Sequence, residues 1–145
     1  MSSRSDLLEY VATELVPSGA LLTRLVTREV GGLPRSEVGV LNTLGAGPRR
    51  ITELAELEGL AQPTMTLLVK RLEEQGLVAR ERSDADGRVV IVTITVAGSR
   101  ALAGFLEQVH DFLRDALAEL PDARIEALAV AAGALAELIT TLRAR

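Results

Sequence analysis

The stretch from residue 62 to residue 72 combines an apolar stripe with hydrogen-bonding and cationic side chains. Its apolar residues recur at i, i+3, i+4 and i+7, which predicts an amphipathic helix from Gln62 to about Gln75. The apolar stripe consists of Met65, Leu68, Val69 and Leu72. The outward side of this helix, together with its first turn, carries Gln62, Pro63, Thr64, Thr66, Leu67 and Lys70.

These outward residues have the chemistry needed to read a nucleic-acid duplex. The Gln62 amide can pair with an adenine edge, and the hydroxyls of Thr64 and Thr66 can bond phosphates or bases. Leu67 offers an apolar contact to a thymine methyl group, and the Lys70 ammonium can pair with a phosphate. The alternative is an ordinary amphipathic helix whose polar face meets only water.

A second set of candidate residues lies in a predicted β-hairpin. The β-rich runs Leu77–Arg82 and Arg88–Val96 flank a turn-forming segment, Ser83–Gly87, which indicates a hairpin with its loop at that segment. The Arg88 guanidinium at this tip could enter a narrow minor groove, where the potential is most negative, while Asp86 holds the loop or orients an arginine. The alternative is an Asp-Gly turn with an incidental arginine.

Other arginines near these elements leave two interpretations open. Arg80 and Arg82 alternate with Glu81, so both point to one strand face, where phosphate contact and simple solvation are equally compatible with the pattern. Arg49 and Arg50 precede a short helix and could touch the DNA backbone, and the segment they begin could pair with a hairpin edge. Arg71, flanked by acids, could form a structural ion pair or contact DNA.

The elements that must position these residues follow one another without interruption. Thr52 is the expected N-cap of a two-turn helix that ends at Gly59 and turns Leu54, Ala55 and Leu57 inward. The helix from Gln62 and the hairpin come next. Two short helices followed by a hairpin form a winged helix, a module that grips duplex DNA. The expected fold class is mainly α with a small β-hairpin wing.

Helical patterns flank this module on both sides. We expect a helix over Asp6–Glu14, a break at Pro17 because the preceding residue is pushed out of the α region, and a helix from about Gly19 to Val30. A helix opened by Pro34 turns Val38, Leu41 and Leu44 inward. Two apolar helices, from Ser99 to Leu120 and from Pro121-Asp122 to about Leu142, follow the hairpin. They carry more apolar surface than a small winged helix can bury alone, so we expect a homodimer.

Composition excludes several classes of protein. The 145 residues include no Cys and one His, His110, which we expect on the surface or at a dimer interface, so a disulfide framework and a metal centre are not expected. No paired acids lie at a Gly-rich or strand-end site, so we expect neither an enzyme nor a cofactor. We expect a cytoplasmic protein without a membrane span, because no apolar run approaches about 20 residues. The net charge of −4 counts against a general polyanion binder.

The chain resembles the MarR family of winged helix–turn–helix transcription regulators over nearly its whole length. That family typically shows Thr-x-x-x-Leu-Ala in the first helix, Pro-Thr-x-Thr in the recognition helix, Gly-Leu-Val before the wing, Asp-x-Arg at the wing tip and Leu-Thr-x-x-Gly after it. The matching segments are Ile51–Leu57, Pro63–Thr66, Gly76–Val78, Asp86–Arg88 and Ile94–Gly98. Ala61 stands where a serine N-cap is common, and Leu67 where a basic residue often follows.

The resemblance implies a single MarR-like domain, 1–145. Residues 33–98 would be its DNA-binding part, and residues 1–32 and 99–145 would form a helical dimerisation part. It implies a homodimer that binds pseudo-palindromic double-stranded DNA, usually as a repressor, and is often released by a small aromatic or acidic effector. An effector cavity would lie near Pro17 and Pro34, where Tyr10, Arg24 and Arg28 are candidate lining residues, with ordinary packing or surface roles as the alternative. The competing function is a winged-helix module that binds protein instead of DNA. The net charge of −4 is compatible with that function.

Overall fold

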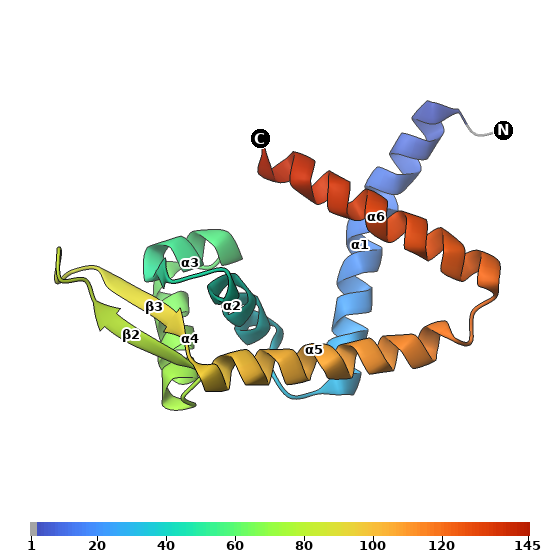
Figure 1. Cartoon of the computed structure of the whole chain (residues 1–145). Coiled ribbons are helices and arrows are strands. Elements are labelled where there is room, and N and C mark those ends of the chain that lie inside the picture. The colour runs from blue at the N-terminus through green and yellow to red at the C-terminus, as the bar shows by residue number, and fades with distance from the viewer. Residues whose placement is uncertain (1–2) are drawn as a thin grey trace. The chain divides into compact units, whose positions relative to one another are not determined.

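The computed structural model describes residues 3–145, and their elements are mainly helices with one small antiparallel sheet (Figure 1). In chain order they are α1 (Arg4–Val30), α2 (Arg35–Gly45), β1 (Arg49–Arg50), α3 (Ile51–Glu58), α4 (Gln62–Glu74), β2 (Val78–Arg82), β3 (Val90–Ile94), α5 (Val96–Leu117) and α6 (Asp122–Arg143). This confirms the expected fold class. The chain divides into two compact units, one up to Val109 and one from His110 onward, so the boundary along the chain falls within the residues of α5.

The core of the first unit lies between α2, α3, α4 and the sheet. The apolar stripe expected on α4 is buried throughout, and its neighbours in the core come from the other elements of this winged part. The fully buried side chains include Val40, Leu41, Leu44, Leu54, Met65, Val69, Leu72 and Val92. Burial of this stripe leaves the polar face of α4 in solvent.

One inward position on α3 was predicted wrongly. Leu57 is 62% exposed, whereas Leu54 and Ala55 are buried. The helix begins at Ile51, which is also buried, so its inner stripe at i, i+3, i+4 and i+7 ends at Glu58 instead of Leu57. The Glu58 carboxylate accepts a hydrogen bond from the Thr43 hydroxyl at 2.8 Å, which links α3 to α2.

The sheet has the strand order β1-β3-β2, with both pairs antiparallel. Arg49 pairs with Val92 and Arg50 with Ile91, which confirms the expectation that this segment joins a hairpin edge. In the hairpin, Val78 pairs with Ile94 and Arg82 with Val90. The loop between the strands is therefore two residues longer than expected, and Arg88 lies in it instead of beginning a strand.

Two helix starts also differ from the predicted ones. Arg50, not Thr52, is the N-cap of α3, and its backbone N–H donates to the Glu53 carboxylate at 3.4 Å. Helix α5 begins at Val96 instead of Ser99, because the Thr95 hydroxyl accepts from the Gly98 N–H at 3.0 Å. The same hydroxyl donates to the Gly76 carbonyl oxygen at 2.6 Å and ties the start of α5 to the end of α4.

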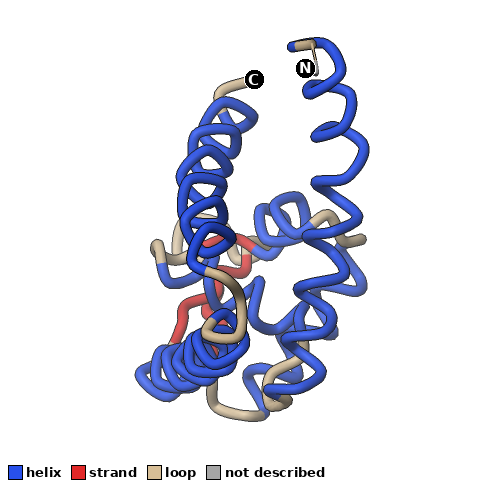
Figure 2. The backbone as a smooth tube through the Cα atoms, turned by 90° about the vertical axis from the view of Figure 1, so that its right-hand side faces the viewer, coloured by secondary structure: helices blue, strands red, loops and turns tan. Residues whose placement is uncertain are grey.

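The predicted break at Pro17 is wrong, because α1 runs without interruption from Arg4 to Val30 with Pro17 inside it (Figure 2). Proline removes one backbone donor and crowds the carbonyl four residues earlier. Thr13, which bears that carbonyl, and Pro17 itself are both exposed, so water can satisfy the oxygen that loses its partner. The remaining bonds of a 27-residue helix outweigh this single loss.

Helix α6 in the second unit is exposed along its whole length, although most of its residues are apolar. By length and composition it is long and apolar enough to cross a membrane, although its uninterrupted apolar run, between Glu126 and Glu137, stays well short of about 20 residues. Ala and Gly lie between the larger apolar residues, so α6 is apolar on every side. Helices of this composition also occur in soluble proteins, where other helices pack around them.

Candidate nucleic-acid interface

The polar face of α4 is open to solvent from its first residue. Gln62, Pro63, Thr64, Thr66 and Lys70 are all exposed, and Leu67 is 65% exposed. The Thr66 hydroxyl donates to the Gln62 carbonyl oxygen at 3.0 Å, which orients its oxygen lone pairs outward. Ala61, the N-cap, supplies no side-chain hydrogen bond, so the first-turn N–H groups of α4 stay available to an anion.

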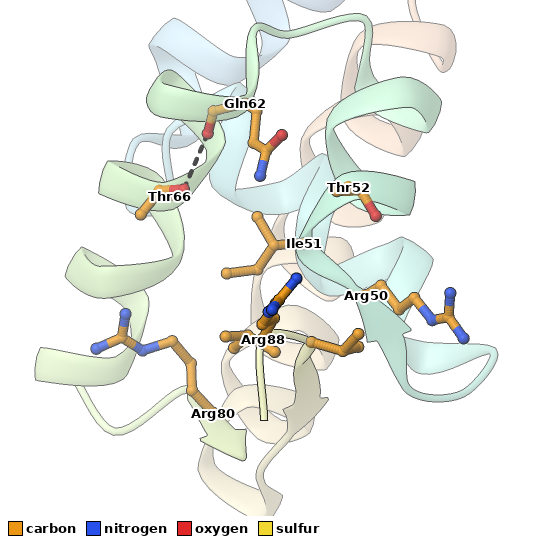
Figure 3. A pocket seen from close by; sticks show the side chains of 9 residues that line it. Arg50, Ile51, Thr52, Gln62, Thr66, Arg80 and Arg88 are labelled. Carbon is orange, nitrogen blue, oxygen red and sulfur yellow. Dashed lines mark hydrogen bonds between the residues drawn. The ribbon is translucent and has the colours of Figure 1, made fainter. Parts of the chain in front are cut away.

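A hollow of about 280 Å³ separates the start of α4 from the hairpin, which is the wing of this fold (Figure 3). It brings together amide, hydroxyl and guanidinium groups from four elements and the wing loop. Its walls are Arg50, Ile51, Thr52, Gln62, Thr66, Arg80, Arg88, Val89 and Val90. Five of the residues chosen from the sequence therefore meet in one place, and the concave surface is suited to a negatively charged, hydrogen-bonding ligand.

The wing loop is held by its own backbone and by Asp86. The Asp86 carboxylate accepts from the Arg88 N–H at 3.0 Å, and the Asp86 carbonyl oxygen accepts from the Val89 N–H at 3.0 Å. Arg82 donates to the Gly87 carbonyl oxygen at 3.4 Å across the loop. These contacts fix the backbone beside Arg88, whose own side chain is exposed at the hollow.

Arg80 is joined to the end of α4 by an ion pair that the sequence patterns did not reveal. Its Nη2 and Nε donate to one Glu73 carboxylate oxygen at 2.8 and 3.1 Å, and its backbone N–H donates to the other oxygen at 3.2 Å. The Arg80 guanidinium bonded to it holds the pKa of Glu73 below its ordinary value. The only signal in the sequence was an acid and an arginine seven positions apart on either side of a Gly turn, Gly76.

Apart from Arg50, the remaining cations lie outside this hollow. Arg49 is half-buried and donates to the Pro48 carbonyl oxygen at 2.9 Å, while Arg50 reaches the hollow and lies 3.8 Å from Glu53. Within the residues that the structure describes, Lys70 and Arg71 make no ion pair. Lys70 thus remains a free cation on the exposed face of α4.

The effector candidates are only partly brought together. Arg24 and Arg28 line a hollow of about 390 Å³ where α1 meets α2, together with Thr27 and Arg35, a residue that the sequence patterns did not single out. Arg28 also pairs with Glu29 at 3.0 Å. Tyr10 is 67% exposed and is not among the residues that line this hollow. Over residues 3–145, no group of three or more His, Cys, Asp or Glu side chains is placed to hold a metal.

Known proteins resemble this chain in sequence. Residues 31–89 match the sequence profile of the MarR family. The uncharacterized HTH-type transcriptional regulator YxaD of Bacillus subtilis is 35% identical over 98 residues, which cover 67% of this chain and 68% of YxaD. A second regulator of that organism, YcgE, is 29% identical over 65% of this chain and 61% of its own length.

The fold also matches a solved complex. The transcriptional repressor CouR, bound to a 23-mer DNA duplex, superposes with a TM-score of 0.65 at 27% identity, covering 94% of this chain and 99% of CouR. The matched profile lies on the module that builds the hollow, and the structural match extends over the flanking helices. This chain is therefore a member of the MarR family of DNA-binding transcriptional regulators.

Proposed function

We propose that the protein is a homodimeric repressor of pseudo-palindromic operators, and that a small aromatic or acidic effector releases it from DNA. The observation that carries this proposal is the hollow in which Gln62 and Thr66 of α4 face Arg88 of the wing. A duplex laid across it would take α4 into its major groove and Arg88 into the adjacent minor groove. Such a regulator acts in the cytoplasm, with the chromosome.

In this arrangement residues 33–98 contact DNA and the helices on either side make the dimer. Base edges would be read by Gln62, Thr64 and Thr66, with Pro63 and Leu67 as apolar contacts. The phosphates would be held by cations around this face, which give affinity without sequence information. These cations are Lys70, Arg49, Arg50, Arg80 and Arg82.

The dimer is supported by apolar surface that each unit leaves uncovered. In α1, Leu7, Leu8 and Val11 are about half exposed, and in α6 Leu128, Leu138 and Leu142 are 40–55% exposed. The second unit also has an apolar hollow of about 520 Å³, lined by residues such as Leu113, Leu117 and Ile125. Contiguous apolar surface of this kind marks an interface, and a second copy of the chain would cover it. Sedimentation at micromolar concentration should give the mass of a dimer.

Release by an effector is supported by the hollow at the α1–α2 junction. Three guanidinium groups, those of Arg24, Arg28 and Arg35, line it and would favour a carboxylate. An aromatic acid that binds there should lower operator affinity and raise the melting temperature, because binding to the folded state stabilises it. A screen of aromatic acids that shows neither effect would favour a repressor controlled by its own abundance.

Selection of duplexes from a random pool tests the proposal directly. The protein should enrich a pseudo-palindrome with half-sites about one helical turn apart. Substituting Gln62 or Thr66 should change which sequences are enriched. Failure to enrich any duplex, with the fold intact, would favour a winged-helix protein-interaction module, the second candidate, which the net charge of −4 supports.

A further inference from the structure

Arg80 stands between two hollows with different charges. On one side, in the hollow of about 280 Å³ beside α4, it shares the wall with two other cations, Arg50 and Arg88. On the other side, in a hollow of about 250 Å³, it adjoins the carboxylates of Glu73 and Glu81 as well as Arg82. The Arg80 guanidinium can therefore bind a group in either hollow. The charges that line each hollow decide which group it binds.

In the free protein, Arg80 is bound to Glu73, in the hollow that contains carboxylates. Glu73 accepts three hydrogen bonds from Arg80, two from the guanidinium and one from the backbone. The Nη1 atom of Arg80 makes no hydrogen bond within residues 3–145. The residues that line the hollow beside α4 include Arg50 and Arg88 but no carboxylate, so no lining side chain on that side competes with Glu73 for Arg80. The pair is nevertheless exchangeable, since the side chains of Arg80 and Glu73 are 33% and 36% exposed and an exposed ion pair is weak.

We propose that Glu73 withholds Arg80 from the DNA backbone, and that a phosphate entering the hollow competes with Glu73 for this guanidinium. The inference rests on the proposed placement of DNA across α4 and the wing. In this proposal, Glu73 lowers the affinity of the protein for DNA without contacting DNA itself. Its effect is to keep one cation per protomer out of non-specific phosphate contacts, which lowers affinity for random sequence and leaves base reading to α4.

The test measures binding as a function of salt for Glu73→Gln and for matched variants. The probes are a duplex selected by the wild-type protein and a mixed-sequence duplex of equal length. Glu74→Gln removes the same charge from a neighbouring residue that attracts Arg80 only through space and makes no hydrogen bond or ion pair with it in the described chain. Glu73→Asp keeps the charge but shortens the side chain. Arg80→Ala, alone and combined with Glu73→Gln, shows whether the effect passes through Arg80.

Glu73→Gln should bind the mixed-sequence duplex about three- to tenfold more tightly than Glu74→Gln does, with a salt slope steeper by about one to two units for the dimer. Glu73→Asp should shift binding in the same direction by a smaller factor. The gain beyond that of Glu74→Gln should vanish when Arg80 is replaced by Ala. Thermal melting of every variant confirms that the compared proteins are folded.

Three results would overturn the inference while leaving the proposed function intact. Equal effects of Glu73→Gln and Glu74→Gln would show that only the net charge matters. A gain that persists without Arg80 would show that Glu73 acts through another residue. Weaker binding by folded Glu73→Gln or Glu73→Asp would show that Glu73 presents Arg80 to DNA instead of withholding it. If the wild-type protein binds neither duplex, the proposed function itself fails and the inference fails with it.

Discussion

The Asp86 carboxylate accepts a hydrogen bond from the backbone N–H of Arg88 at 3.0 Å, so the wing fixes the backbone of the arginine, while its guanidinium makes no hydrogen bond or ion pair within residues 3–145. The bond spans two residues of an exposed loop that the Asp86 carbonyl oxygen closes a second time, through the Val89 N–H. The two residues therefore have separable roles, with Asp86 ordering the loop and Arg88 lining the hollow beside α4.

Replacing Arg88 with Ala should weaken operator binding by roughly 1–3 kcal/mol per contacted site, because the minor groove loses its cation. The melting temperature should hardly change, since the side chain is exposed and its loss uncovers no core residue. Titration of a labelled operator measures the first quantity and thermal unfolding the second. Wild-type affinity in this variant would show that the wing does not contact DNA.

Replacing Asp86 with Ala should weaken operator binding by less than the Arg88 substitution does, because it loosens the loop without removing the cation. Asp86→Asn is the matched control, since its amide oxygen can still accept from the Arg88 N–H at nearly the same position. We expect the Asn variant to bind more tightly than the Ala variant. Equal losses in the two variants would point to the charge of Asp86 instead of its hydrogen bond.

Gly98 should tolerate no side chain, because a methyl group there would overlap the Leu77 carbonyl oxygen and come within 2.9 Å of Ile94. Gly98→Ala should lower the free energy of unfolding by about 1–3 kcal/mol, the usual cost of forcing extra volume into a packed site. Gly104→Ala in the same helix is the control, since nothing lies within 4 Å of its added methyl group. That variant should be unchanged or more stable by up to about 1 kcal/mol.

The Glu73–Arg80 pair should make stability depend on acid pH. Hydrogen bonds from Arg80 lower the pKa of Glu73 from its ordinary value of 4.5. The stabilisation is therefore complete above pH 4.5 and is lost as the pH falls through the lowered pKa. The difference in unfolding free energy between the wild type and Glu73→Gln should shrink across that range. A difference that stays constant down to strong acid would mean that the ion pair adds no stability.

Salt should weaken operator binding steeply despite the acidic composition. A dimer that neutralises about 6–10 phosphates should lose affinity with a logarithmic salt slope of about −5 to −9. Lys70→Ala should flatten this slope by about one to two units for the dimer, equally for all sequences, because Lys70 is a free cation on α4. A wild-type slope near zero would mean that the winged helix does not grip a DNA backbone.

Features that depend on neighbours along the chain could be predicted from the sequence. The buried stripe of α4 and the polar face opposite it follow from helical spacing, since 3.6 residues per turn decide both at once. The hairpin followed from two β-rich runs around a turn. Leu57 shows the limit of this reasoning, because the inner stripe of α3 runs through Ile51, Leu54, Ala55 and Glu58 and leaves Leu57 exposed.

The sequence by itself therefore determined the winged helix and the exposed polar face of α4 that we propose as the DNA-reading surface, because helix periodicity, turn residues and strand runs are local properties of the chain. Only the tertiary structure decided which partners and neighbours the arginine side chains have. The ion pair between Arg80 and Glu73, the placement of Arg50 and Arg88 in one hollow and that of Arg35 and Arg24 in another depend on where separate elements pack. Ion pairs and hollows join residues distant in sequence, and no local spacing encodes those distances.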